Sequence, residues 1–314
     1  MEDQHYNGDI WNKEAFTLLS LFGWSKIGDY DMDVSGDDEK KMGIDTIVSF
    51  ETPLKTRPQL IILEAKRYLT TSFSKSYLQE WINRLDTKLL KLRNSNGLKQ
   101  RFPIVEDCTI LDTGVIVIWF ADIENYSSFH DKFIEAMRQI SLSSRQRKAG
   151  TNKIFVLDNV MFMKLFALQD VLRELKKDTD ITFLYASRFI NEEPISRSKV
   201  LTVEYMFSDI IFAESGKGST HKAYVFYFGQ LNYVSFELVY SAYSSTSLYD
   251  KDIPIDLYVY NKDDEFRKIE SEIKERIFDG FNVKIKYMVS SNNIPSYIVF
   301  ITIEQPKLIR NIRV

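Results

Sequence analysis

Cysteine is almost absent from this sequence of 314 residues, and histidine is scarce. The single cysteine, Cys108, cannot form a disulfide within the chain. One thiol and three scattered histidines also cannot assemble a zinc finger or a cysteine-rich metal cluster. We therefore expect a protein of the reducing cytoplasm.

Long apolar runs and low-complexity segments are missing too. The longest apolar run, at 114–121, is far shorter than the roughly 20 residues that cross a bilayer. The acidic, polar start lacks the basic region followed by an apolar region that marks a secretory signal. With only 12 glycines and 7 prolines, collagen-like and disordered classes are excluded. We expect a soluble, unexported globular protein with no membrane partner.

The net charge of −3 hides an uneven distribution along the chain. Residues 1–50 hold eleven acidic and four basic side chains, a net of −7, whereas residues 55–101 hold three acidic and eleven basic ones, a net of +8. A basic segment of this kind can neutralise phosphates even in a protein whose total charge is negative. The alternative is that these charges only solvate helix surfaces.

The apolar periodicity predicts an α/β protein with two domains. Helices are expected at 11–22, 72–93, 127–143, 160–177 and 263–278, and strands at 43–50, 59–65, 114–120, 153–157, 181–185, 255–260, 283–289 and 297–303. Residues 29–41 are expected to form a loop, and the aromatic segments 200–212 and 224–243 to form strands. Helices and strands alternate up to residue 190, which favours parallel strands joined by crossover helices. We place the first domain at 1–192 and a second, aromatic-rich α+β domain at 193–314.

Three charged residues, Asp45, Glu64 and Lys66, are candidates for one metal-binding site. Glu64 and Lys66 end the apolar strand LIIL, and alternation along a strand puts both on one face. Asp45, nineteen residues earlier, lies on the neighbouring strand and can reach the same place. Two carboxylates and the backbone carbonyl of Ala65 are the hard oxygen ligands that Mg²⁺ prefers, and a nearby ammonium can orient a metal-bound water.

The Glu-x-Lys pattern is weak by itself, because it occurs four times in this chain. One copy lies in the polar segment 39–41, and two lie on predicted helices at 174–176 and 272–274, where such pairs are ordinary surface. Only Glu64 and Lys66 follow an apolar run typical of a buried strand, where charged side chains are rare unless they are paired or functional. The structural alternative is an ion pair between these two side chains.

The segment GIDTIVSF...QLIILEAKRY, between a helix that bears Glu14 and an amphipathic basic helix, resembles the PD-(D/E)xK nuclease superfamily. EAKRY looks most like the Mrr-type restriction endonucleases. The resemblance covers residues 10–120 and implies a restriction-endonuclease-like mixed sheet flanked by helices, with residues 120–190 as a β/α extension. It also implies that Glu14 is an additional ligand or a water-orienting acid, and that Gln79 matches a supporting glutamine of the family.

By the same resemblance, Asp45 and Glu64, with the Ala65 carbonyl, are ligands of Mg²⁺, for which Mn²⁺ can substitute, and Lys66 is the catalytic lysine. The reaction implied is hydrolysis of a DNA phosphodiester bond by a metal-bound water. The basic residues nearby could hold the DNA backbone without reading its sequence. They are Arg67, Lys75, Arg84, Lys88, Lys91 and Arg93.

Restriction or anti-phage defence is the role that the resemblance implies. We expect a protein partner, as in two-protein defence complexes that carry similar nucleases, or a homo-oligomer. The competing hypothesis is a catalytically inactive, nuclease-like subunit that binds nucleic acid or protein. RNA cleavage by the same site is a third possibility, because no residue in the sequence discriminates 2′-hydroxyl recognition.

Overall fold

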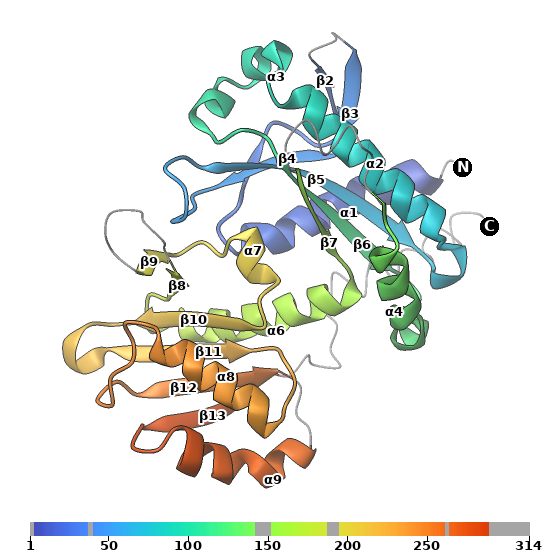
Figure 1. Ribbon diagram of the computed structural model, residues 1–314. Coiled ribbons are helices and arrows are strands. Elements are labelled where there is room, and N and C mark those ends of the chain that lie inside the picture. Colours follow the sequence, from blue (N-terminus) through green and yellow to red (C-terminus); the bar gives the residue numbers. More distant parts are fainter. Residues whose placement is uncertain (1–2, 37–39, 142–151, 187–194, 261–263, 289–314) are drawn as a thin grey trace. The chain divides into compact units, whose positions relative to one another are not determined.

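The computed structural model describes residues 3–36, 40–141, 152–186, 195–260 and 264–288 (Figure 1). The chain divides into two compact units. The first holds Met1–Glu51 and Arg57–Phe162, and the second holds Thr52–Thr56 and the described chain from Met163 onward. The domain boundary predicted at residues 192–193 lies outside the described residues and stays a prediction. Among the described helices, none is both long and apolar enough to cross a membrane.

A five-stranded mixed sheet forms the centre of the first unit. Its strands, in spatial order, are β1 (Ser25–Ile27), β4 (Thr46–Phe50), β5 (Gln59–Tyr68), β6 (Thr113–Phe120) and β7 (Lys153–Leu157). β4 is antiparallel to β1 and β5, whereas β6 is parallel to β5 and β7. Every residue of β6 is buried, as is typical of a parallel strand that is covered on both faces.

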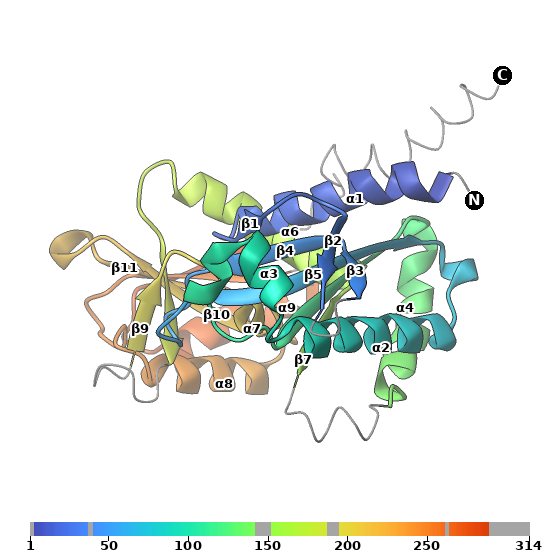
Figure 2. The ribbon, with the colours of Figure 1, turned by 90° about the horizontal axis from the view of Figure 1, so that it is seen from above.

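Helices cover both faces of this sheet. Figure 2 shows α1 (Asp3–Ser20) above it and α2 (Lys75–Leu92) with α4 (Ile123–Arg138) below it. α2 begins at Ser74, whose hydroxyl accepts a hydrogen bond from the backbone N–H of Tyr77. Its buried residues, spaced three and four apart, pack on β5 and β6 in one hydrophobic core. The prediction of a mixed sheet flanked by helices is confirmed.

One predicted loop in the first unit is wrong. Within residues 29–41, β2 (Met32–Ser35) pairs with β3 (Lys41–Ile44) in a small antiparallel sheet. Met32 and Val34 are buried and alternate with more exposed Asp33 and Ser35. This short alternation was obscured by the surrounding acidic residues. The strand predicted at 43–50 is correspondingly broken at Asp45, which lies in a bend between β3 and β4.

The second unit contains a six-stranded sheet. Its strands, in spatial order, are β13 (Val283–Met288), β12 (Ile255–Tyr260), β11 (Lys222–Tyr227), β10 (Ile210–Ser215), β8 (Thr182–Ala186) and β9 (Ile195–Ser198). The remaining helices are α6 (Asn159–Leu175), which contains the division between the units, α7 (Val203–Met206), α8 (Tyr233–Ser244) and α9 (Asp264–Glu272), which continues as a π-helical turn at Ile273–Ile277. Short α3 (Asn96–Arg101) and the 3₁₀ turns Thr70–Ser72, Pro103–Asp107 and Gly218–Thr220 complete the described elements.

Three further predictions are corrected in this unit. The segment 200–212, predicted as a strand, contains α7 at Val203–Met206, and β10 begins only at Ile210. The strand predicted to extend to residue 243 ends at Tyr227, and residues Tyr233–Ser244 form α8. Asn232 begins this helix by accepting a hydrogen bond from the N–H of Ser235, and Phe236, Val239 and Tyr243 face the core with helical spacing. β8 is not a parallel strand of the first sheet but an antiparallel neighbour of β10. The strand predicted at 297–303 lies outside the described residues.

The two sheets share one order of connections. In the first, the antiparallel pair β4–β5 is followed by α2, parallel β6, α4 and parallel β7. In the second, the antiparallel pair β10–β11 is followed by α8, parallel β12, α9 and parallel β13. On the face that packs against α8, β11 carries Ala223, Val225 and Tyr227. The described second unit thus repeats the connectivity without an acid-and-lysine pair on the helix-covered face of that strand.

Gly114 on β6 allows α2 to approach the sheet closely. A Cβ atom at this position would lie 2.6 Å from Cδ2 and 2.8 Å from Cγ of the fully buried Leu85. We expect Gly114→Ala to lower the free energy of unfolding by about 1–3 kcal/mol, because the packed core must shift. Gly43→Ala is the matched control, since its Cβ would meet nothing closer than 3.9 Å. Urea denaturation measures both, and equal stability of the two variants would contradict this account of the packing.

Candidate active site

Asp45, Glu64 and Lys66 meet at one place in the first unit. Glu64 and Lys66 lie two residues apart on β5, and their side chains form an ion pair with Nζ 3.5 Å from Oε2. Asp45 precedes Thr46, which pairs with Leu63 across the β4–β5 ladder, so Asp45 lies beside Glu64. The bend after β3 turns its carboxylate towards β5, where Oδ2 accepts a hydrogen bond from the Ala65 N–H at 3.1 Å.

The ammonium of Lys66 lies among three oxygen atoms. Nζ is 3.4 Å from Asp45 Oδ2, 3.5 Å from Glu64 Oε2 and 3.3 Å from the Ala65 carbonyl oxygen. These belong to the three residues that the sequence analysis assigned to a metal ion. A positive group therefore already stands where two carboxylates and a carbonyl converge, and this donor set suits a hard divalent cation.

Burial differs sharply within this cluster. The side chain of Glu64 is only 1% exposed, whereas those of Asp45 and Lys66 are 21% and 20% exposed. A buried carboxylate is held in one position by its surroundings, and the other two side chains remain accessible from outside. The cluster therefore has a fixed base and an open side that a substrate can reach.

Lys88 is a member of this cluster whose position the sequence analysis did not foresee. Its ammonium lies 2.5 Å from Glu64 Oε1, and its side chain is 11% exposed. A signal was present, because Lys88 continues the inward stripe of Trp81, Leu85 and Leu92 on α2. A lysine at an inward position of an amphipathic helix needs a partner, and here that partner is Glu64.

A hydrogen-bonded loop supports Asp45 from behind. The backbone N–H of Asp31 donates to the carbonyl of Asp45 at 2.9 Å, and Asp31 has a positive φ of 53°. The buried Asn12 on α1 donates from Nδ2 to Asp31 Oδ1 at 2.9 Å. Through Asn12, the first helix thus fixes the bend that carries Asp45. The sequence analysis does not identify this role of Asn12.

Glu14 also lies on α1, where it is half-buried. Burial raises the pKa of its carboxyl above the ordinary value, and the charge of Lys13 opposes this. Burial raises the pKa of Tyr30, and the negative charge of Glu14 adds to this shift. Within the described chain, no hydrogen bond or ion pair joins Glu14 to Asp45, Glu64 or Lys66. Its role as an additional ligand stays a prediction.

Gln79 is engaged elsewhere. Its amide donates to the carbonyl of Ser141 at 2.9 Å and accepts from the N–H of Ser141 at 3.0 Å, and it also donates to Asn83. In the part of the chain that the structure describes, no bond connects Gln79 with the carboxylates. The structure therefore shows Gln79 tying α2 to the segment after α4, and its predicted catalytic role is untested.

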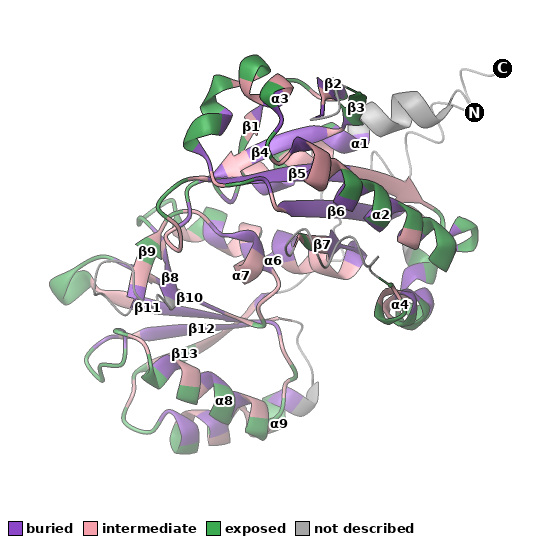
Figure 3. Cartoon of the chain, turned by 45° about the horizontal axis from the view of Figure 1, so that its top comes forward, coloured by how far each residue is buried: buried purple, intermediate pink, exposed green. Residues whose placement is uncertain are grey.

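The six predicted DNA-binding residues divide into two groups. Arg84, Lys88 and Lys91 line one open hollow of about 530 Å³ along α2, which Met42 of β3 borders. The outer face of α2 is largely exposed in Figure 3. The other three residues do not line this hollow. Lys75 donates to Gln139, Arg93 donates to Asn152, and Arg67 is largely buried, which lowers the pKa of its guanidinium.

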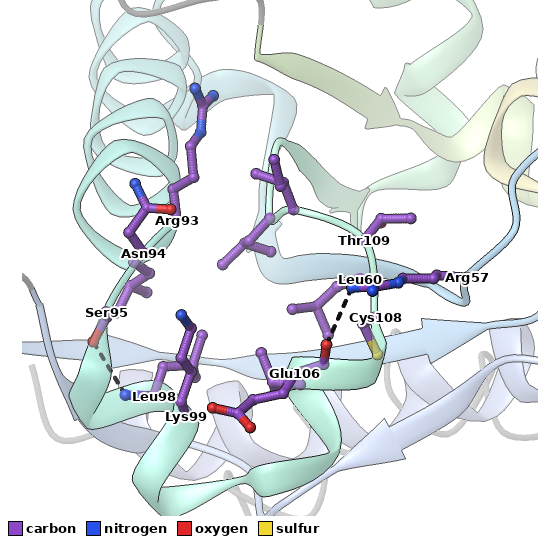
Figure 4. A pocket seen from close by; sticks show the side chains of 14 residues that line it. Arg57, Leu60, Arg93, Asn94, Ser95, Leu98, Lys99, Glu106, Cys108 and Thr109 are labelled. Carbon is purple, nitrogen blue, oxygen red and sulfur yellow. Dashed lines mark hydrogen bonds between the residues drawn. The ribbon is translucent and has the colours of Figure 1, made fainter.

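The group of Asp45, Glu64, Lys66 and Lys88 is called the acidic cluster below. A second hollow lies away from it. It has a volume of about 230 Å³, and Arg57, Leu60, Arg93, Ser95, Glu106 and Cys108 are among the residues that line it. Figure 4 shows Arg57 donating to the backbone carbonyl of Glu106 on one side of it. Neither carboxylate of the cluster, nor Lys66, lines this hollow.

The sequence comparison decides the family. Residues 1–161, just over half of the chain, match the family described as the GAPS4 protein PD-(D/E)XK nuclease domain. The chain belongs to this PD-(D/E)XK nuclease family. The match covers every residue of the acidic cluster, and nucleases of the PD-(D/E)XK type typically use divalent metals.

Other comparisons add little to this family assignment. A search of curated proteins finds no significant match. A solved structure of Aa-Ago with externally bound siRNA is similar at 12% identity and a TM-score of 0.20. The alignment covers 84% of this chain and 40% of that one, so this chain spans well under two thirds of the length of the matched protein.

The suitability of this site for a metal ion depends on oxygen ligands and not on a group of several side-chain ligands. Among the described residues there is no group of three or more His, Cys, Asp or Glu side chains arranged for a metal ion. The PD-(D/E)XK cluster supplies two carboxylates and one backbone carbonyl instead, with the Lys66 ammonium between them. Mg²⁺ commonly binds through one or two carboxylates and completes its coordination with water and substrate oxygens.

The buried position of Glu64 predicts a stability effect. Glu64→Gln removes the charge that Lys66 and Lys88 share, and it leaves two ammonium groups in a partly buried place. We expect the free energy of unfolding to fall by about 2–4 kcal/mol, since breaking a buried ion pair on one side leaves an uncompensated charge. Chemical denaturation at neutral pH, with Glu80→Gln on the exposed side of α2 as the control, measures this. A variant as stable as the unaltered protein would show that the lysines do not depend on Glu64.

Proposed function

We propose that this protein is a Mg²⁺-dependent deoxyribonuclease that hydrolyses phosphodiester bonds in anti-phage defence. The observation that carries the proposal is the convergence of Asp45, Glu64 and Lys66 at one open-sided place. The family match supports a nuclease, and the choice of DNA, of Mg²⁺ and of defence is our own inference. We further infer that it acts in the cytoplasm, in keeping with its single unpaired thiol.

Each residue of the cluster has a defined task in this proposal. Asp45, Glu64 and the carbonyl of Ala65 would hold the cation, and Mn²⁺ can replace Mg²⁺ there. A bound divalent cation supplies Lewis-acid polarisation of the phosphate and lowers the pKa of bound water. Lys66 contributes a positive charge on the accessible side, where it orients the attacking water and stabilises the negative charge that develops on the phosphate.

The hollow along α2 gives the substrate a place next to this cluster. Arg84 and Lys91 line it, and Lys88 belongs both to the hollow and to the acidic cluster. Basic side chains bind the phosphate backbone and carry no sequence information of their own. Asp45, Glu64 and Lys66 do not line this hollow, so DNA held there would approach the cluster at Lys88. Its affinity should fall as salt rises because counterions are released on binding.

The competing hypothesis is a catalytically inactive, nuclease-like subunit. Such a subunit needs no cluster in which two acidic side chains and a lysine meet within 3.5 Å, so the geometry favours the active enzyme.

We also propose that the protein works with a second polypeptide or as a homo-oligomer. Val234 and Leu238, one turn apart on α8, are both exposed, and apolar side chains of this kind are suited to such a contact.

The proposed reaction is tested by incubating linear and supercoiled DNA, and RNA, with Mg²⁺, Mn²⁺ or EDTA. We expect metal-dependent cleavage of DNA that falls at least about 100-fold in Lys66→Ala, because a group that stabilises developing charge is lost. Asp45→Ala should abolish cleavage. Lys177→Ala, at an exposed lysine of the second unit, should cleave at the normal rate.

Two results would contradict the proposal. Cleavage that persists in EDTA or in Asp45→Ala would place the chemistry elsewhere. Equal cleavage of RNA and DNA would overturn the choice of substrate. Light scattering, run beside the assay, tests the proposed partner or homo-oligomer. A monomer that cleaves DNA as fast alone as with any neighbouring gene product would contradict both.

A further inference from the structure

Lys88 differs from the other basic residues of α2 in its surroundings. Its side chain is 11% exposed, whereas that of Arg84, one turn earlier, is 58% exposed and pairs with Glu80 of the same helix. The Lys88 ammonium donates to Glu64 Oε1 at 2.5 Å, which is a short, charge-assisted contact. It is therefore committed to a carboxylate and not held ready for a phosphate.

Glu64 is gripped from two sides. Lys88 of α2 holds Oε1, and Lys66 of the same strand lies 3.5 Å from Oε2. Because Glu64 is 1% exposed, little water remains to compete with either lysine. The contact from α2 fixes the rotation of the carboxylate and determines which oxygen faces the Lys66 side.

The four linked side chains also balance in charge. Asp45 and Glu64 bring two negative charges, and Lys66 and Lys88 bring two positive charges. A divalent cation entering this group meets no excess of negative charge. A bound phosphodiester would bring a negative charge and restore the attraction, and Lys88 also lines the hollow along α2 in which we place the DNA.

We propose that Lys88 is a positioning residue that orients Glu64 and lowers the affinity of the free protein for divalent cations, so that cation binding is coupled to phosphodiester binding. The inference rests on the proposed function, because it concerns the same cation site. It assigns Lys88 a role different from that of Arg84 and Lys91, which remain substrate contacts. The coupling would keep the site largely without cation until nucleic acid arrives.

Titration with Mn²⁺, followed by electron paramagnetic resonance of the free ion, measures this affinity without any cleavage. In the absence of DNA we expect Lys88→Met to bind Mn²⁺ about tenfold more tightly than the unaltered protein, because a positive charge next to a ligand is removed. Lys91→Met is the matched control, with the same charge change one turn away, and should bind Mn²⁺ normally. Lys88→Arg keeps the positive charge and should bind Mn²⁺ as weakly as the unaltered protein does.

The coupling is measured by repeating the titration with a short phosphorothioate-substituted DNA duplex. The duplex should tighten Mn²⁺ binding clearly more in the unaltered protein than in Lys88→Met. Lys88→Gln serves as a second neutral variant, and thermal unfolding identifies which of the two is folded. A merely structural role would instead weaken Mn²⁺ binding in the neutral variants, because Glu64 would lose its orientation without any gain in negative potential.

The outcomes separate this inference from the function it rests on. Unchanged or weaker Mn²⁺ binding in Lys88→Met, or an equal gain in Lys91→Met, overturns the role of Lys88. Asp45→Asn tests the site itself, since it should remove the Mn²⁺ binding of every variant. Binding that survives Asp45→Asn would overturn the proposed cation site, and with it this inference.

Discussion

The ion pairs around Glu64 connect the main parts of the first unit. The carboxylate sits at the end of the buried part of β5, and the two ammonium groups that hold it come from the same strand and from α2. Charge in the interior is tolerated only where it is paired. The packing of α2 on the sheet, including its close approach at Gly114, therefore has a chemical as well as a structural purpose, because it delivers Lys88 to Glu64.

A second dependence runs through the opposite face of the sheet. Asn12 on α1 holds Asp31, and the backbone of Asp31 holds the bend that carries Asp45. Elements on both faces thus meet where Asp45, just before β4, lies beside the middle of β5, and groups from distant parts of the sequence come within hydrogen-bonding distance. The second unit has the same connectivity, but its strand β11 turns only Ala223, Val225 and Tyr227 towards the core on the helix-covered face. The proposed chemistry therefore depends on the side chains around Asp45 and Glu64 and not on the connectivity.

The sequence was sufficient for the parts that depend on local periodicity. The apolar run before Glu64 marks a buried strand, and its period of two places Lys66 beside Glu64. The stripe on α2 is equally plain. Asp45 could be placed near them because its strand adjoins β5, although the bend that turns its carboxylate inward follows from Asn12 and Asp31, which lie in other elements.

What the sequence could not supply depends on tertiary contacts. Aromatic residues suit strands and buried helices alike, so the sequence predicts a strand over 224–243. The cap at Asn232 and the packing on the second sheet make Tyr233–Ser244 a helix. The inward position of Lys88 was visible in the helical stripe, but its partner lies 24 residues away on another element. Gln79 was assigned by resemblance, and its contacts with Ser141 could be found only from the folded chain.

We propose that Asp45, Glu64 and the Ala65 carbonyl enclose one cation position. A crystal structure of the full chain soaked in Mn²⁺, with anomalous scattering collected at the manganese edge, tests it most directly. We expect an anomalous peak bounded by these three groups, with the Lys66 ammonium displaced from the place it holds among them. A peak confined to other residues, or a fully ordered cluster with Lys66 in place and no peak at saturating Mn²⁺, would contradict it.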